Sequence, residues 1–411
     1  MATKYDYFEL IYKNKSIVSP KEIARKFPKK GYSSIYKQLL ELEKEKLIEK
    51  KNNGFQAVVS EKTELLFQLI EHCLKNQINY NSILDEQFAK FVKASMEKKE
   101  VNTYNSGLNS RTLRKYIYIL KNSELALIIS EKPLRVKIFY NPLLNNLLLF
   151  YGLKKINLDL TKIDYTKEIE KELGIYKNLR NKNETRYRQI VGNIQINFIY
   201  HSLSMEGNPT TLLDTKKILK EEILPSDLLS KYSDEIRNYR NALKKMILDA
   251  ESGKQLSVPL ILEYHKLSMQ HMPEIAGKIR STNVYISGNP DFMVSLPENI
   301  RSDLDSLLSK YLLFIQGRNL SFTKLMDFSV SFHNAFQHIH PFEDGNSRTT
   351  RLLAFYIFQQ KNIPIFDIPY GLLDEYLVST KGSKTRNDDK LREVLQKTIL
   401  YNLRTINELL R

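Results

Sequence analysis

The sequence predicts a mainly helical protein in which small α+β units precede a larger, almost wholly helical region. Two observations support this fold class. Apolar residues recur at helical spacing along most of the chain, and strand patterns are short and end in hairpin turns. With 411 residues, 42% hydrophobic and 27% charged, the chain can form two or three domains. We expect winged-helix-like units at residues 1–60 and 61–150, a helical linker at 151–185 and a helical domain at 186–411.

The first unit is predicted from its turn and cap residues. A helix begins near Tyr7, and Ser19-Pro20 then caps a second one, with proline at its first position. A third helix follows Gly31. The turn Asn52-Asn53-Gly54 joins two short strand patterns, and Asn-Gly is a strong hairpin signal. Three helices followed by a hairpin is the element order of a winged helix, a relative of the helix-turn-helix.

The same order recurs in residues 61–150. Helical patterns cover 65–74, 82–94 and 111–122, and two strand patterns flank the turn Glu131-Lys132-Pro133. If this unit contacts DNA, the third helix should carry the contact, because basic and aromatic side chains gather near its start. These are Arg111, Arg114, Lys115 and Tyr116. Winged helices also bind proteins, so the fold alone leaves both uses open.

Net charge and cysteine content limit the partners and the compartment. The formal charge is +16, and residues 1–150 contribute +10 of it, from 26 Lys and Arg against 16 Asp and Glu. This excess raises nucleic acid as a partner, although an AT-rich gene would explain part of the lysine content. A single cysteine, Cys73, excludes an intramolecular disulfide and favours a reducing compartment. With no apolar signal segment or membrane-spanning run, we expect a cytoplasmic protein without a membrane partner.

One isolated hairpin pattern lies inside the helical half. After Gly277-Lys278-Ile279-Arg280, apolar and polar residues alternate around a Gly288-Asn289-Pro290 turn. The first strand would contain Val284, Tyr285 and Ile286. A lone hairpin in a helical region contributes little to a core, so we expect it to have a role other than packing. An ordinary surface hairpin is the alternative.

The segment from His340 to Arg351 carries the strongest chemical signal. His340 has a reference pKa near neutrality and can accept a proton. Asp344 offers hard oxygen ligands for Mg²⁺. Gly345, Asn346 and Ser347 precede an apolar run that reads as a helix, whose N-terminus favours anions. Two arginines, Arg348 and Arg351, lie three apart and can face one phosphate group. A solvated helix–turn–helix corner is the alternative, but packing does not explain this combination.

This segment resembles the signature of the Fic family, H-x-F-x-[D/E]-G-N-[G/K]-R-x-x-R. The matching residues are His340, Phe342, Asp344, Gly345, Asn346, Arg348 and Arg351. Ser347 stands where the pattern has glycine or lysine, and we expect a modified phosphate site that still functions. A second segment, from Ser202 to Gly207, resembles the inhibitory motif of the family, [S/T]-x-x-x-E-[G/N], with Ser202 and Glu206 in the matching places. Gly207 also fits a plain helix C-cap, and both interpretations can hold together.

The resemblance implies the transfer of AMP from ATP to a Tyr, Ser or Thr hydroxyl of a protein. His340 would be the base, Asp344 would hold Mg²⁺ or Mn²⁺, and Gly345, Asn346, Ser347 and Arg348 would hold phosphates. Arg351 would bind the γ-phosphate unless Glu206 pairs with it, and the hairpin would be the target-docking flap. Two alternatives stay open. One is another reaction of the same scaffold, such as removal of AMP or another phosphodiester transfer. The other is a DNA-binding regulator that senses nucleotide. The protein target, self-modification among 24 tyrosines and homo-oligomer formation stay undecided.

Overall fold

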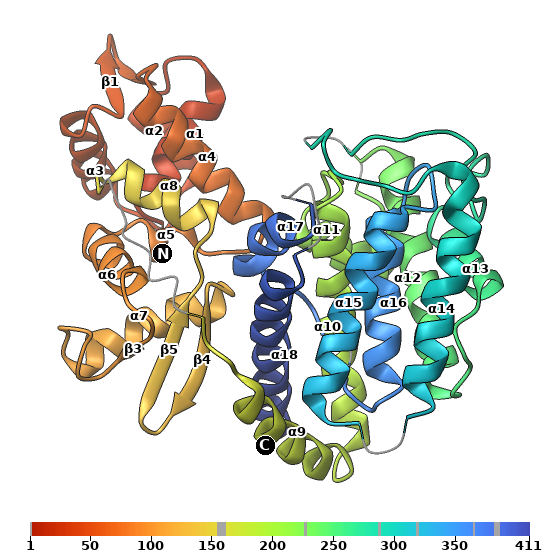
Figure 1. Ribbon diagram of the computed structural model, residues 1–411. Helices are drawn as coiled ribbons and strands as arrows, with labels where there is room; N and C mark the ends of the chain where they lie inside the picture. Colours follow the sequence, from red (N-terminus) through yellow and green to blue (C-terminus); the bar gives the residue numbers. More distant parts are fainter. Residues whose placement is uncertain are drawn as a thin grey trace. The chain divides into compact units, whose positions relative to one another are not determined.

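The computed structural model describes residues 2–153, 162–225, 228–286, 289–317, 320–364, 366–381 and 387–411 (Figure 1). The chain divides into two compact units. Unit 1 contains residues 1–98, 104–123 and 142–159, and unit 2 contains residues 99–103, 124–141 and 160–411. Each unit is therefore built from more than one stretch of the sequence.

Unit 1 is helical with one small sheet. Its elements are α1 (Lys4–Asn14), α2 (Pro20–Lys26), α3 (Tyr32–Lys44), β1 (Ile48–Lys51), β2 (Gly54–Ala57), α4 (Glu61–Lys75), α5 (Tyr80–Ile83), α6 (Glu86–Met96), α7 (Ser110–Asn122) and α8 (Pro142–Phe150).

The first 60 residues follow the element order expected from the sequence. Thr3, Ser19 and Ser60 cap α1, α2 and α4 with their side-chain oxygens, and each forms a capping box. Strands β1 and β2 pair antiparallel, with Lys51 opposite Gly54 at the turn. Phe55 of β2 also pairs with Val18, ahead of α2, which adds a short third bridge. The hairpin signal in the sequence therefore corresponds to a real hairpin.

The basic residues proposed for DNA contact lie on α7. Arg111, Arg114 and Lys115 are exposed there. Tyr116 is 7% exposed and its ring packs against Phe88 and Phe91 of α6. The expectation that Tyr116 joins the basic surface is therefore wrong, because the tyrosine faces the core. DNA contact by the three basic side chains stays a prediction.

Unit 2 is a helical bundle with one three-stranded antiparallel sheet in the order β3-β5-β4. The strands are β3 (Val101–Asn102), β4 (Ala126–Glu131) and β5 (Leu134–Ile138). Thus the helices that the sequence assigned to the second winged-helix unit lie in unit 1, whereas its hairpin lies in unit 2. The helices of unit 2 are α9 (Thr166–Arg180), α10 (Glu184–Ser204), α11 (Leu212–Lys216), η1 (Lys217–Glu221), α12 (Ser230–Glu251), α13 (Val258–Ser268), η2 (Pro297–Asn299), α14 (Ile300–Ile315), α15 (Phe322–Ile339), α16 (Asn346–Gln359), η3 (Tyr370–Leu372), α17 (Leu373–Lys381) and α18 (Asp388–Leu410).

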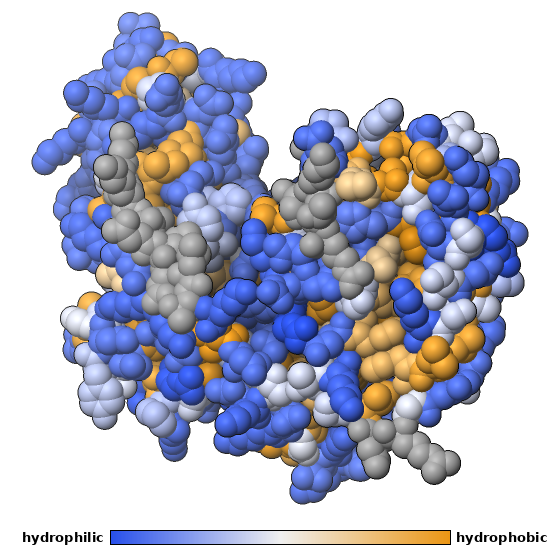
Figure 2. Space-filling model, in the orientation of Figure 1, coloured by the Kyte–Doolittle hydropathy of each residue, from blue (hydrophilic) through white to orange (hydrophobic). Residues whose placement is uncertain are grey.

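Helix α16 forms the centre of the bundle. Residues 346–358 are all buried, and α16 packs against α12, α13 and α15. Figure 1 shows α15 and α16 running side by side. Helix α18 covers α9, α10, α15 and α17. The surface seen in Figure 2 is mostly hydrophilic with separate apolar areas. A helix that is buried on all sides is a core helix, so the loop before α16 is fixed on a rigid element.

The expected β-hairpin at residues 281–294 is not a regular one. The described residues of this segment contain a single antiparallel bridge, Ile286 to Asn289. Ser287 and Gly288, where the turn was placed, lie outside the described residues. Side chains occupy carbonyls that a strand ladder would use: Arg280 donates to the Thr282 oxygen, and His338 lies 2.6 Å from the Met293 oxygen. Among the described residues, no helix is both long and apolar enough to cross a bilayer.

Candidate active site

His340 terminates α15 in a strained, buried position. It is the C-cap residue, with a φ of 48°, and its N–H donates to the Phe336 oxygen at 3.0 Å. Its side chain is mostly buried, and Nδ1 lies 3.1 Å from the Gln337 oxygen. A carbonyl can only accept, so Nδ1 carries the proton and Nε2 keeps its lone pair. Burial lowers the pKa of His340 to about 4, with Lys381 and Arg280 adding to the effect. The imidazole is therefore neutral at pH 7.

The loop after His340 is closed by Asn346. The Asn346 side chain accepts from the Phe342 N–H at 2.9 Å and donates to the Phe342 oxygen at 2.7 Å. Both polar atoms of the amide are thereby used within the loop. Phe342 is fully buried and stacks on His265, with ring centroids 3.7 Å apart. Phe342 thus anchors the loop in the core, and Asn346 sets its shape.

His265 of α13 supports the same loop from below. Its Nδ1 accepts from the Gly277 N–H at 2.9 Å, so its Nε2 carries the proton. Nε2 donates to the backbone carbonyl oxygen of Asp344 at 2.9 Å. Burial lowers the pKa of His265 to about 4. Gly345 passes directly over this ring with a φ of 79°, and a Cβ there would lie 3.0 Å from His265 Nε2 and 2.9 Å from Met269 Sδ. Glycine is required at this position by both conformation and space.

Asp344 and Arg348 bring opposite charges to the start of α16. Arg348 Nη2 donates to Asp344 Oδ2 at 2.8 Å, and Nη1 pairs with Glu235 of α12. Arg348 is 3% exposed at its side chain, whereas Asp344 is 55% exposed. The first turn of α16 also has backbone N–H groups without intrahelical acceptors, which favour an anion. An exposed carboxylate beside an anion site suits Mg²⁺, which shares few protein oxygens with phosphate oxygens and waters.

Arg351 is buried and held by the end of α10. Its Nε donates to Ser202 Oγ at 2.6 Å, and its Nη2 donates to the Ser202 oxygen at 3.0 Å and to Glu206 Oε1 at 2.9 Å. Ser202 and Glu206 are therefore brought to Arg351 across about 145 residues of sequence. Burial opposes the charged form of Glu206, but Arg351 and Lys381 outweigh it and lower the pKa of the carboxyl. Gly207, with a φ of 90°, also ends the helix, so the C-cap interpretation holds as well.

Arg280 connects the flap segment, residues 281–295, to the loop that follows His340. This side chain is 3% exposed and donates to three carbonyls: His340 at 2.7 Å, Thr282 at 2.7 Å and Ser295 at 2.5 Å. Its own N–H donates to the Pro341 oxygen at 2.9 Å. His338 stacks on Phe292 of the same segment, with ring centroids 4.2 Å apart. The flap segment is thus fixed to the loop at both ends.

The expected docking residues of the flap differ in exposure. Tyr285 is 82% exposed, Val284 is half-buried and Ile286 is 8% exposed. Ile286 therefore belongs to the core of unit 2, and Tyr285 is the side chain that faces solvent.

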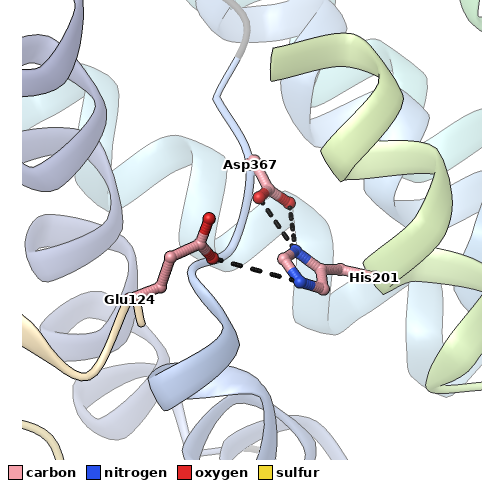
Figure 3. A group of neighbouring side chains, drawn as sticks. All are labelled: Glu124, His201 and Asp367. Carbon is pink, nitrogen blue, oxygen red and sulfur yellow. Dashed lines mark hydrogen bonds and ion pairs between the residues drawn. The ribbon is translucent and has the colours of Figure 1, made fainter. Parts of the chain in front are cut away.

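A buried ionic cluster anchors α10 one residue before Ser202. His201 Nδ1 lies 2.8 Å and 3.0 Å from the two carboxylate oxygens of Asp367, and Nε2 lies 4.0 Å from Glu124 (Figure 3). The three groups lie close enough together to hold a metal ion, and the Asp367 separations are those of a hydrogen-bonded ion pair. Burial opposes the charged imidazole, but Asp367 and Glu124 outweigh it and raise the pKa of His201. The cluster fixes the part of α10 that presents Ser202.

The site therefore contains residues that sequence patterns did not assign to it. They are Glu235, which pairs with Arg348, Lys381, which pairs with Glu206, and His265 and Arg280, which bond to the loop. His265 both packs against Phe342 and holds the loop. His333 Nε2 lies 2.7 Å from the Tyr376 hydroxyl inside the bundle, outside the loop. The residues between His340 and Arg351 could be found because they are contiguous, whereas these four lack a local signal.

Comparison with known proteins identifies the fold. Residues 255–358 match the Fic/DOC family. Proteins named "Protein adenylyltransferase Fic" from Drosophila erecta and Drosophila melanogaster are 29% and 28% identical over 179 residues, which is 43% of this chain and 35% of each of those proteins. A Fic domain containing signaling protein from Bacteroides thetaiotaomicron superposes with a TM-score of 0.53 at 20% identity, over 59% of this chain and 96% of that one.

The helical bundle and its loop thus form a Fic fold. The motif from His340 to Arg351 lies within the residues that match the Fic/DOC family. The chain spans about a third of the length of the curated relatives it matches.

Proposed function

We propose that this protein transfers AMP from ATP to a hydroxyl group of a protein and that Glu206 restrains the reaction. The hydroxyl oxygen would attack the α-phosphorus of ATP. The bond between that phosphorus and the oxygen bridging to the β-phosphate would break, and pyrophosphate would leave. The two Drosophila relatives are named as enzymes of this type, which supports the proposal.

His340 is the base of the proposed reaction. Its Nδ1 proton is used by the Gln337 carbonyl, so Nε2 is the nitrogen that accepts the hydroxyl proton. A base with a pKa near 4 is weak, but the positive charges of Lys381 and Arg280 contribute to that value. The arrival of a negatively charged triphosphate opposes these charges and raises the pKa. Nucleotide binding should therefore strengthen the base at the moment it is needed.

The start of α16 would hold the phosphates. Its backbone N–H groups, Arg348 and Ser347 surround the helix N-terminus, and Asp344 offers an exposed carboxylate for Mg²⁺ or Mn²⁺. When bound, the metal would neutralise phosphate charge as the leaving group departs. Arg348 is paired with both Asp344 and Glu235. Part of that pairing must therefore be exchanged for phosphate contacts.

The contact of Arg351 with Ser202 and Glu206 carries the proposal. A carboxylate 2.9 Å from this guanidinium occupies the position where a phosphate would otherwise bind. It also places negative charge beside a site built for anions. Arg351 is almost completely buried, so the guanidinium cannot turn out into solvent to bind a phosphate while Glu206 stays paired with it. Removing the carboxylate should release the arginine and permit productive ATP binding.

The test is incorporation of label from α-labelled ATP with Mg²⁺ into purified protein and into added candidate proteins. We would compare the unmodified chain, Glu206→Gly and Glu206→Gly with His340→Ala. We expect weak labelling of the first, strong labelling of the second and none of the third. Glu251→Gly, which changes an exposed glutamate at the end of α12, is the matched control and should behave like the unmodified chain.

ATP binding is measured on the same proteins, because a protein target absent from the assay would also prevent labelling. If Glu206→Gly neither binds ATP nor takes up label, the transferase proposal is wrong. If it binds ATP and the unmodified chain binds it equally well, the restraint by Glu206 is wrong, whereas the transferase proposal stands.

A further inference from the structure

Glu206 has a second cationic partner besides Arg351. Its Oε1 accepts from Arg351 Nη2 at 2.9 Å, and its Oε2 lies 3.6 Å from Lys381 Nζ. The two cations come from different helices, α16 and α17. A single carboxylate is therefore shared between a buried guanidinium and an ammonium group that ends another helix.

Lys381 lies close to Glu206, just beyond the end of α10, and to Asn289 of the flap segment, and its charge acts on His340. It is the last residue of α17, and its backbone oxygen accepts from Asn289 Nδ2 at 2.7 Å. Its charge also contributes to the lowered pKa of His340. Its ammonium group therefore acts on both Glu206 and the proposed base.

The two cations differ in how free they are to bind a ligand. Arg351 is 2% exposed at its side chain and keeps two contacts with Ser202 that do not depend on Glu206. Lys381 is 27% exposed, and Glu206 is the carboxylate with which it pairs among the described residues. A lysine has a flexible stem and a compact charge, so it can follow a phosphate group over several ångströms. When Glu206 leaves, both cations lose this carboxylate, but Arg351 stays held by Ser202 whereas Lys381 can move.

We propose that Lys381 binds the β,γ-phosphate end of the nucleotide and that Glu206 inhibits by neutralising Lys381 as well as Arg351. This assignment rests on the proposed function. It gives the terminal phosphates a second positive group beside Arg351, and the Glu206 carboxylate and these phosphates become alternative ligands of the same two cations. It also predicts that the contribution of Lys381 depends on the nucleotide having those phosphates.

The experiment measures dissociation constants of ATP and AMP, with Mg²⁺, by isothermal titration calorimetry. The parent is Glu206→Gly, and the variants add Lys381→Met, Lys381→Arg or Lys310→Met. Lys310 is an exposed lysine of α14 and serves as the matched control. We expect Lys381→Met to weaken ATP binding roughly tenfold, equal to about 1.4 kcal/mol, with AMP binding unchanged. Lys381→Arg should restore most of the affinity, and Lys310→Met should change nothing.

A second comparison uses the chain with Glu206 intact. There Lys381 is already paired, so Lys381→Met should change the ATP dissociation constant by no more than about threefold. An unchanged ATP affinity of Glu206→Gly with Lys381→Met would overturn the assignment. So would an equal loss of ATP and AMP binding, which would indicate that Lys381 only supports the fold. If the Glu206→Gly parent bound no ATP, the proposed function would fail, and this assignment with it.

Discussion

The position of Gly345 allows a quantitative test of the loop geometry. In Gly345→Ala, the new Cβ would lie 2.9 Å from Met269 Sδ and 3.0 Å from His265 Nε2. The backbone would also keep a φ of 79°, which costs an L residue about 1–2 kcal/mol. Relieving the overlap adds about 1–3 kcal/mol, because the neighbours are packed. We expect Gly345→Ala to lower the free energy of unfolding by about 2–5 kcal/mol.

Gly253 provides the matched control for this prediction. It has a φ of 72°, but a Cβ there would meet nothing within 4 Å. Gly253→Ala should therefore show the conformational cost alone, about 1–2 kcal/mol. Urea unfolding of both variants gives the difference between their free energies of unfolding. That difference is the cost of the contact of the new Cβ with Met269 and His265. Equal destabilisation by the two substitutions would refute the close approach of Gly345 to this support.

Three further outcomes are expected. The pKa values of His265 and His340 are lowered to about 4 in the folded protein, so the neutral imidazoles contribute stability that is fully present above pH 6.5. As the pH falls from 6.5 towards 4, the free energy of unfolding should decrease by about 3 kcal/mol for each group. An unfolding free energy that does not change over that range would contradict this prediction. Arg280→Met leaves three carbonyls without their donor and should cost about 2–4 kcal/mol, with Arg280→Lys intermediate, as measured by thermal unfolding; full stability of the methionine variant would contradict it. Asp367→Asn replaces the carboxylate beside His201 with a neutral amide, so NMR titration should show a lower pKa for His201. Urea unfolding should show a free energy of unfolding lower by about 3 kcal/mol. An unchanged His201 pKa would exclude the ion pair.

Many elements followed from local chemistry. Ser19 and Pro20 predicted where α2 begins, and the structure confirms both the cap and the first position. The ends of the linker helices did not follow from local chemistry: α9 ends at Arg180 and α10 begins at Glu184, inside the stretch that the sequence predicted only as helical. Apolar spacing defines that a helix exists, but its ends depend on which caps and tertiary contacts are stronger.

Among its described residues, the expected hairpin pairs at a single bridge, Ile286 to Asn289, for a reason that local patterns could not reveal. Alternating residues and a Gly-Asn-Pro turn predicted paired strands. In the structure, Arg280 and His338 take carbonyl groups of this segment instead. A side chain from outside the pattern thus competes with the strand ladder for the same acceptors. Only the folded chain decides that competition.

The sequence by itself determined the central chemistry of the site. A base, a carboxylate, a glycine turn and two arginines lie within twelve consecutive positions, so one loop and one helix start bring them together in any fold that preserves that turn. Tertiary structure decided what surrounds them. It placed Glu206 between Arg351 and Lys381, and it brought Arg280 to the backbone carbonyl of His340. These contacts join residues 60 to 175 positions apart, and their formation depends on how the helices pack, which no local pattern encodes.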